Sequence, residues 1–251
     1  MEEGIYIYCI TGSKKPESFD AAGIGGRGDD VYTVCFRDIS AVVSIAPIKK
    51  YTVSRENLIA HERVIEEVMK THTVLPVRFA TIAENEEKVR KILEREYQKF
   101  CDLLKNMENK KELGLKIMFK EDMVYKEILE NNHDIKMLKE KISEMPPEKS
   151  HYQRMEIGRM VEAALQREKE LCKEEVLSIL SPISVRMVTN TTYGELMVVN
   201  AAFLVESEKE DKFDMSVQNL ADRYGEKTRF KYTGTLPPFN FVNLVISMAE
   251  A

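Results

Sequence analysis

Apolar residues in the first 120 positions follow two spacings, a period of two and a period of three to four. Residues 5–10, 31–36 and 41–45 are rich in β-branched and aromatic side chains, which is typical of strands. Arg37 and Asp38 fit the link between the second and third of these segments. The pattern predicts three strands, the last two paired as a hairpin.

Two helices and two more strands are predicted in the rest of this region. Ser54 is a suitable N-cap for a helix that ends near residue 71. Its apolar face consists of Leu58, His61, Ile65 and Val68. Residues 84–107 have acids in the first turn and an apolar stripe, which predicts a second helix. Residues 73–81, where Pro76 suits an edge strand or a bulge, and residues 114–119 are predicted strands of one sheet that two helices cover.

The second half of the chain opens on a charged stretch. Residues 121–149 are rich in Lys and Glu and close on Met145, Pro146 and Pro147, so connecting helices are expected. After it, helix, strand, strand, helix and strand are predicted at residues 150–180, 183–189, 195–205, 208–224 and 228–233. We therefore expect an α+β fold of two small sandwiches. The expected parts are an N-terminal domain (1–120), a helical linker (121–149) and a C-terminal α/β domain similar to a ferredoxin-like half (150–251).

Composition narrows the class of protein. Hydrophobic residues make up 43% and charged residues 31% of the 251 residues, which argues against disorder. The net charge of −5 offers no general attraction to nucleic acid. The sequence shows no basic signal peptide and no apolar run of about 20 residues, so no membrane segment is expected. The four cysteines are far apart, and we expect reduced thiols in the cytoplasm.

One glycine-rich segment matches a known pattern. Residues 23–28, Gly-Ile-Gly-Gly-Arg-Gly, have the spacing of the dinucleotide-binding fingerprint. That fingerprint must follow a strand and open a helix, whereas a predicted strand follows here. The segment is therefore expected to be a flexible turn between strands rather than a phosphate-binding loop.

The strongest polar candidates surround the first predicted helix. His61 and Glu62 resemble the start of a zinc-binding helix, but position 65 is Ile, so we expect no metal. We predict instead that His61, Glu62 and Arg78 form a structural polar clamp between this helix and the strand that follows it. The competing interpretation is an ordinary, partly buried histidine. No nucleophile and base stand in a catalytic pattern, so neither catalytic residues nor a cofactor site are expected.

Several segments, taken in order, resemble the gas vesicle protein F/L family. The most specific is Leu58 through His61-Glu62 followed by Leu75-Pro76-Val77-Arg78-Phe79. The others are Tyr6-Ile7-Tyr8, residues 23–26, residues 38–44, residues 200–205 and residues 234–242 with the double proline. The sequence departs from the family pattern where Ala80 replaces a usual Gly, Leu113 and Leu236 replace aromatic residues, and Phe239 replaces Tyr.

This resemblance implies a modified ferredoxin-like N-terminal domain and a C-terminal α/β domain. It also implies a role in gas vesicle assembly, as a minor vesicle component that contacts shell protein A and other accessory proteins. A shell subunit exposes apolar surface and aggregates in water unless another protein covers it, so a chaperone-like role is expected. The expected location is the cytoplasm and the gas vesicle.

The end of the chain offers a candidate partner contact. Two prolines hold the segment around Leu236, Phe239 and Phe241 extended, and its aromatic rings are candidates for an exposed surface. The competing interpretation is that Phe239 and Phe241 close the core of the second domain. A second function also stays open, a small-molecule-binding or enzymatic ferredoxin-like protein, since this architecture hosts many functions. A deep pocket near His61 and Arg78 would favour that second function.

Overall fold

The structure is a computed structural model that describes residues 2–143, 146 and 150–246. The chain forms two compact units, which we describe separately. Unit 1 contains the residues up to Glu112 and those from Thr235 onward, and unit 2 contains Leu113–Gly234. Both units combine helices with a sheet, and every strand pair whose register is known is antiparallel, which confirms the predicted α+β class.

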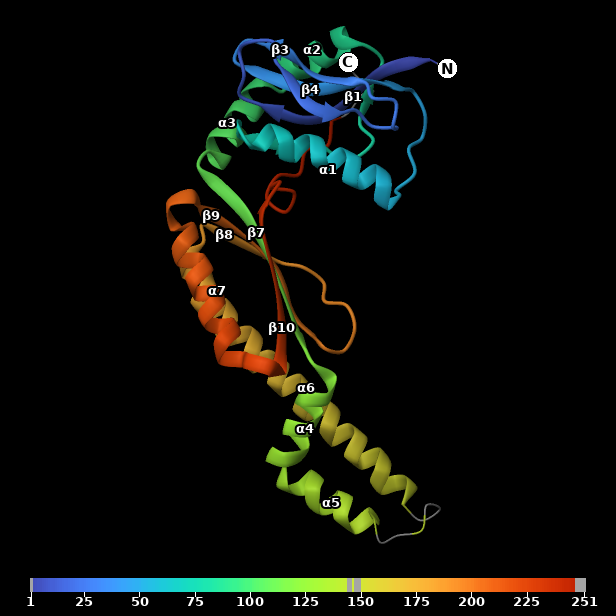
Figure 1. Cartoon of the computed structure of the whole chain (residues 1–251), viewed down its shortest axis with the longest axis vertical. Helices are drawn as coiled ribbons and strands as arrows, with labels where there is room; N and C mark the ends of the chain where they lie inside the picture. Colours follow the sequence, from blue (N-terminus) through green and yellow to red (C-terminus); the bar gives the residue numbers. More distant parts are fainter. Residues whose placement is uncertain (1, 144–145, 147–149, 247–251) are drawn as a thin grey trace. The chain divides into compact units, whose positions relative to one another are not determined.

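Unit 1 is built on a sheet with the strand order β2-β3-β4-β1-β5, and β6 also pairs with β1. Its strands are β1 (Glu3–Thr11), β2 (Ser18–Ala22), β3 (Asp30–Phe36), β4 (Ile39–Pro47), β5 (Val74–Pro76) and β6 (Ile82–Ala83). Its helices are α1 (Arg55–Met69), α2 (Glu86–Arg95) and α3 (Tyr97–Met107). Helices α1 and α2 lie on opposite sides of the sheet (Figure 1). The β3–β4 hairpin and the position of β5 at the sheet edge confirm two predictions.

The core of unit 1 explains why α1 forms where the sequence predicts it. The Ser54 hydroxyl accepts the Asn57 N–H at 3.2 Å, which caps one of the free donors of the first turn. Val64, Ile65 and Val68 recur at helical spacing and are fully buried against the aromatic rings of β1. Burying each such side chain stabilises the fold by about 1.5–3 kcal/mol, so this face fixes the helix on the sheet.

Three details of unit 1 differ from the prediction. Residues 84–107 form two helices, because Glu96, with φ −98° and ψ 11°, ends α2 and begins α3. Strand β2 was not predicted, since Ser-Phe-Asp-Ala-Ala has few apolar side chains. The strand predicted at 114–119 is part of β7 (Lys110–Phe119), which joins the sheet of unit 2. Periodicity identifies a strand but not its neighbours, because pairing depends on contacts distant in sequence.

Unit 2 has a sheet of order β10-β7-β9-β8 and a set of helices. The remaining strands are β8 (Arg186–Thr189), β9 (Met197–Glu206) and β10 (Thr228–Leu236). The helices are α4 (Glu121–Asn131), α5 (His133–Ser143), α6 (His151–Leu180) and α7 (Glu210–Tyr224), with short 3-10 turns at Ser181–Ile183, Ser207–Lys209 and Gly225–Lys227. Phe203 and Phe213 pack with their ring centroids 5.1 Å apart in the core.

The two compact units divide the chain differently from the expected boundaries at residues 120 and 149. Helices α4 and α5 belong to unit 2, and the C-terminal residues from Thr235 belong to unit 1. The physical reason is burial: Val242 and Leu244 are almost fully buried, and Leu244 forms a parallel bridge with Val77 beside β5. Met145 and Pro147 of the expected boundary lie outside the described residues.

No helix among the described residues is long and apolar enough to span a membrane. All four cysteines are free thiols, and Cys9 and Cys172 are buried. Burial raises the pKa of the Cys9 thiol, which keeps it protonated and unreactive. These cysteines therefore behave as small apolar core residues.

Candidate functional site

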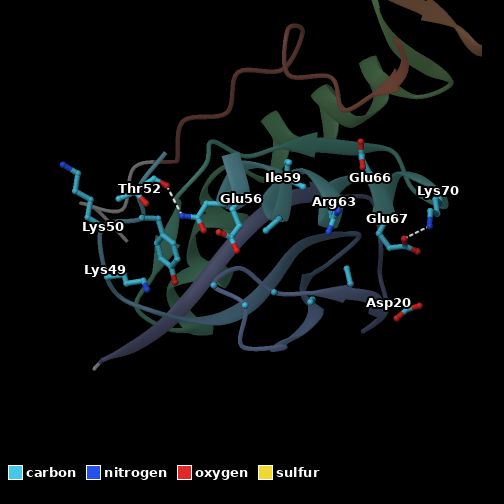
Figure 2. Close-up of a pocket in the computed structure, with 18 residues that line it drawn as sticks. Asp20, Lys49, Lys50, Thr52, Glu56, Ile59, Arg63, Glu66, Glu67 and Lys70 are labelled. Carbon is cyan, nitrogen blue, oxygen red and sulfur yellow. Dashed lines mark hydrogen bonds and ion pairs between the residues drawn. The ribbon is translucent and has the colours of Figure 1, made fainter. Parts of the chain in front are cut away.

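An open groove of about 990 Å³ runs along one flank of α1 in unit 1 (Figure 2). One wall is α1 itself, and the other walls are residues 20–22 of β2, the glycines at 23, 25 and 26, and residues 49–52. We call this feature the α1 groove. All of its lining residues belong to unit 1, so its geometry is that of a single compact unit.

The groove exists because α1 has two different faces. His61 and Val64 lie on the face that packs against the sheet, and both are buried. Ile59, Ala60 and Arg63 lie on the neighbouring face and line the groove. This division follows the 3.6-residue period of the helix, with the apolar stripe inward and a mixed stripe outward. The floor next to α1 is therefore made of small and apolar side chains within a polar rim.

Charges of opposite sign lie at the two ends of the α1 groove. Lys49 and Lys50 lie at the end near the start of α1, while Asp20 and Glu66 lie at the end near its last turn (Figure 2). Close to Glu66, an ion pair between Glu67 and Lys70 adds no net charge. Between the ends, Glu56 and Arg63 contribute one charge of each sign. The groove is therefore neutral as a whole and basic at one end and acidic at the other.

The glycine-rich segment forms one wall of the groove. It lies between β2 and β3, as expected for a turn between strands, and not at a helix start. Gly25 and Gly26 have φ values of 96° and 69°, which L side chains rarely adopt. A Cβ atom built on either of these glycines would meet nothing within 4 Å, so this wall is bare backbone facing open space.

A buried tyrosine fixes this turn to the sheet. The Ile24 N–H donates to the Tyr8 hydroxyl at 2.7 Å, and that hydroxyl also shares a hydrogen bond of 2.9 Å with Ser44 Oγ. The Gly23 N–H donates to the Asp29 carbonyl at 2.9 Å and closes the turn. Because Tyr8 and Ser44 are fully buried, these bonds are shielded from water, and the turn is held in place against β1 and β4.

His61 lies under α1 in a second buried polar network. Its Nε2 lies 3.2 Å from the Val77 carbonyl, and its Nδ1 lies 3.1 Å from the Tyr6 hydroxyl. A carbonyl only accepts, so Nε2 carries the proton and Nδ1 accepts from Tyr6. The Tyr6 hydroxyl in turn accepts the Ala80 N–H at 2.9 Å. Burial lowers the pKa of His61 to about 4, so the ring is neutral at pH 7.

The structure places the three residues of the expected polar clamp in different environments. His61, which is 3% exposed, does contact the segment after its helix, but through the Val77 carbonyl. Arg78 is exposed, and Glu62 is half-buried with its pKa raised by burial and by Glu66. In the described part of the chain, no hydrogen bond or ion pair joins His61 to Glu62 or Arg78. The polar partners of His61 are instead Tyr6 and Val77.

Sequence reasoning missed these partners, although one signal was present. Tyr6 and Tyr8 stand two residues apart in an apolar strand, so both rings point to the same face of the sheet. A buried tyrosine hydroxyl needs a partner, which makes such a pair a sign of a polar network under a helix. Among the residues that the structure describes, no group of three or more His, Cys, Asp or Glu side chains could hold a metal ion.

The C-terminal candidate residues divide into one exposed and one buried aromatic ring. Phe239 is 42% exposed, and its ring centroid lies 6.4 Å from that of His61. Phe241 is buried, which does not suit its predicted role as a partner contact, and it is buried in unit 1 rather than in the second domain, where the competing interpretation placed it. Leu236 is half-buried at the end of β10. Of the three candidates, only Phe239 offers a large apolar surface to a partner.

A buried carboxylate anchors this C-terminal segment. Glu112 is only 2% exposed, and its two carboxylate oxygens accept the backbone N–H and the side-chain Nδ2 of Asn240 at 3.0 and 2.6 Å. Burial raises the pKa of Glu112, while the two hydrogen bonds oppose that effect. The Glu112 carboxylate therefore fixes the position of the C-terminal segment at Asn240.

Comparison with known proteins gives one consistent result. Residues 4–243 match the sequence profile described as "Gas vesicle synthesis protein GvpL/GvpF". The chain is 26% identical to gas vesicle protein F of Nostoc sp., over 97% of this chain and 100% of that protein. It is also 26% identical to gas vesicle protein F1 of Halobacterium salinarum, over 100% and 98% of the two chains. The crystal structure of GvpF from Anabaena sp. superposes with a TM-score of 0.82 at 26% identity, covering 97% of this chain and 99% of that one.

Proposed function

This chain belongs to the gas vesicle synthesis protein family GvpL/GvpF, and we propose that it binds the apolar shell subunit and other accessory proteins during vesicle assembly. The family membership establishes the coarser role, that of a gas vesicle accessory protein, and the family is not a known enzyme family. The proposal adds the direct contact with the shell subunit and a chaperone-like action in the cytoplasm.

The observation that carries the proposal is the α1 groove. It is open to solvent and lined by both small apolar and charged side chains, which suits a segment of another protein. A shell subunit with uncovered apolar surface aggregates in water, and burial of that surface in a groove with a charged rim keeps the complex dispersed. Specific contacts of this kind bury about 1,200 Å² or more, or less if they are transient.

The small-molecule-binding or enzymatic alternative requires accessible polar groups near His61 and Arg78. His61 is almost fully buried, and both of its ring nitrogens are engaged by Tyr6 and Val77. Arg78 is exposed, and no hydrogen bond joins it to His61 in the described ranges. A ligand would first have to displace protein partners from a closed core, so the geometry favours protein binding.

Co-expression with the shell protein tests the proposal. The full chain should co-purify with the shell subunit and lower its light scattering. Ala60→Arg, which places a long cation in the groove, should weaken both effects without unfolding the chain. Met215→Arg on α7, at an exposed position in unit 2, is the matched control and should bind like the wild type. If the folded wild-type chain neither binds nor disperses shell protein, alone or with its accessory partners, the proposed function is wrong.

A further inference from the structure

We propose that the α1 groove receives an amphipathic α-helix whose acidic end lies against Lys49 and Lys50 and whose basic end lies against Asp20 and Glu66. This inference rests on the proposed function and specifies the partner chemistry of the same groove. It concerns a helical segment of a partner gas vesicle protein rather than an extended strand or a small molecule.

The volume of the groove is close to that of half a helix that lies lengthwise in it. Helix α1, which forms its long wall, has 15 residues and therefore extends about 22 Å. Half of a cylinder of that length with the roughly 10 Å diameter of an α-helix occupies about 860 Å³. The groove volume of about 990 Å³ is of the same order. A helix of about four turns therefore fits lengthwise with one face in the groove and the other in water.

The surface of the groove allows a helix to approach closely. Ile59 and Ala60 on α1 and Ala21 on β2 present small or medium apolar side chains to the groove. The wall at Gly25 and Gly26 has no side chains at all. The side-chain ridges of a partner helix pack into the spaces between side chains on the opposing surface, and small residues on that surface leave such spaces. These residues therefore provide the apolar contact of a helix-in-groove complex.

The charges at the two ends are free to pair with a partner. Within residues 2–143, 146 and 150–246, no ion pair engages Lys49, Lys50, Asp20 or Glu66. The Lys49 ammonium lies 5.1 Å from the centre of the Tyr51 ring, a contact that leaves its charge available. Exposed charges at the rim contribute modestly to affinity but select the partner and its orientation. Opposite signs at the two ends therefore favour a helix with separated charges.

Synthetic peptides provide the probes for this proposal. The first is an amphipathic helical peptide of about 15 residues with acids in one half and bases in the other. The second has the same composition with the charges interleaved, and the third is the first peptide with a central proline, which breaks the helix. Fluorescence anisotropy with the full chain measures their affinities. We expect the first to bind about fivefold tighter than the second, since two to four rim pairs contribute roughly that factor.

The proline peptide separates a helix from a strand. It keeps all charges and apolar residues but cannot form a continuous helix. We expect it to bind at least tenfold more weakly than the first peptide, since part of its face no longer reaches the groove. Equal binding of the helical and proline peptides would overturn the helical occupant and indicate an extended segment along β2 or a non-specific apolar contact.

Charge reversal at one end gives a gain of binding as well as a loss. The double variant Lys49→Glu/Lys50→Glu makes both ends of the groove acidic. It should therefore lose its preference for the first peptide over the second. It should also bind a further helical peptide, with bases at both ends, more tightly than the wild type does. Lys139→Glu/Lys141→Glu on α5, two exposed lysines in unit 2, is the matched control. If the reversal leaves the peptide preference unchanged, the proposal is wrong.

Failure of this inference is distinguishable from failure of the proposed function. In one outcome, shell protein co-purifies equally with the wild type and with both charge variants, and no peptide shows a charge preference. This result would support the proposed shell binding and overturn the helix in the α1 groove. Peptide selectivity in a chain that does not bind shell protein would retain the groove as a helix site and assign it to another partner. Circular dichroism of each variant confirms that it is folded.

Discussion

The buried, neutral state of His61 should make unit 1 lose stability in mild acid. In the unfolded chain a histidine titrates near pH 6.5, whereas burial lowers the pKa of His61 to about 4 in the fold. Between these two values the unfolded chain binds a proton that the native state does not, so acid favours unfolding. The stabilisation is present above about pH 6.5 and is lost as the pH falls towards 4.

The magnitude follows from the same shift. Linkage gives a loss of about 2 kcal/mol between pH 7 and pH 5, and about 3 kcal/mol by pH 4. The contacts of His61 agree with a lowered pKa. Its Nδ1 accepts from the Tyr6 hydroxyl, and its ring centroid lies 5.6 Å from that of Tyr8 and 5.7 Å from that of Tyr6. In the described part of the chain, no carboxylate forms a hydrogen bond with this ring. Glu62, the nearest acid in sequence, has its own pKa raised by burial.

The variant His61→Gln isolates this contribution. Glutamine can donate to the Val77 carbonyl and accept from Tyr6, but it does not titrate. Hydrogen exchange of peptides from β1 and α1 reports the opening free energy of unit 1 at pH 7 and pH 5. The wild type should lose about 2 kcal/mol more than the variant over this range. His133→Gln, at an exposed histidine on α5, should keep the wild-type pH dependence. Identical slopes for wild type and His61→Gln would refute the assignment of a buried neutral ring.

Three further outcomes are expected. Ala80→Gly should raise the free energy of unfolding by about 0.5–1 kcal/mol in urea titrations, since Ala80 has a φ of 64° and glycine adopts this region without strain; a loss of stability would contradict this. Glu112→Ala should cost about 1–3 kcal/mol and make the C-terminal segment sensitive to protease, because the two part-buried hydrogen bonds from Asn240 to the carboxylate are lost; unchanged protease resistance would refute the anchor. Residues 113–234 should fold alone, whereas residues 1–112 should need the C-terminal segment added back, as measured by circular dichroism; a stable 1–112 fragment would show that this segment is dispensable.

Most secondary structure of this protein is determined by local sequence. The Ser54 cap and the apolar residues at three- and four-residue spacing specify α1, and the β-branched and aromatic run at the start specifies β1. The glycine-rich segment was also correctly predicted to be a turn that leads into β3 and not a helix start, although the strand before it, β2, was not predicted. For α1 and β1 the deciding signals lie within a few residues, where periodicity and capping act.

Other features depend on contacts between distant residues and were decided only by the tertiary structure. The bond between Tyr6 and His61 spans 55 residues, and that between Glu112 and Asn240 spans 128. The pairing of β7 within the sheet of unit 2 also depends on contacts between distant residues. The same holds for the assignment of the C-terminal segment to unit 1. The break between α2 and α3 is a separate case. The apolar period continues through Glu96, so the sequence pattern predicts one helix, and only the φ and ψ of Glu96 in the structure show that there are two. The α1 groove also arises in this way, because it lies between a helix, an edge strand and a turn whose proximity no single segment encodes.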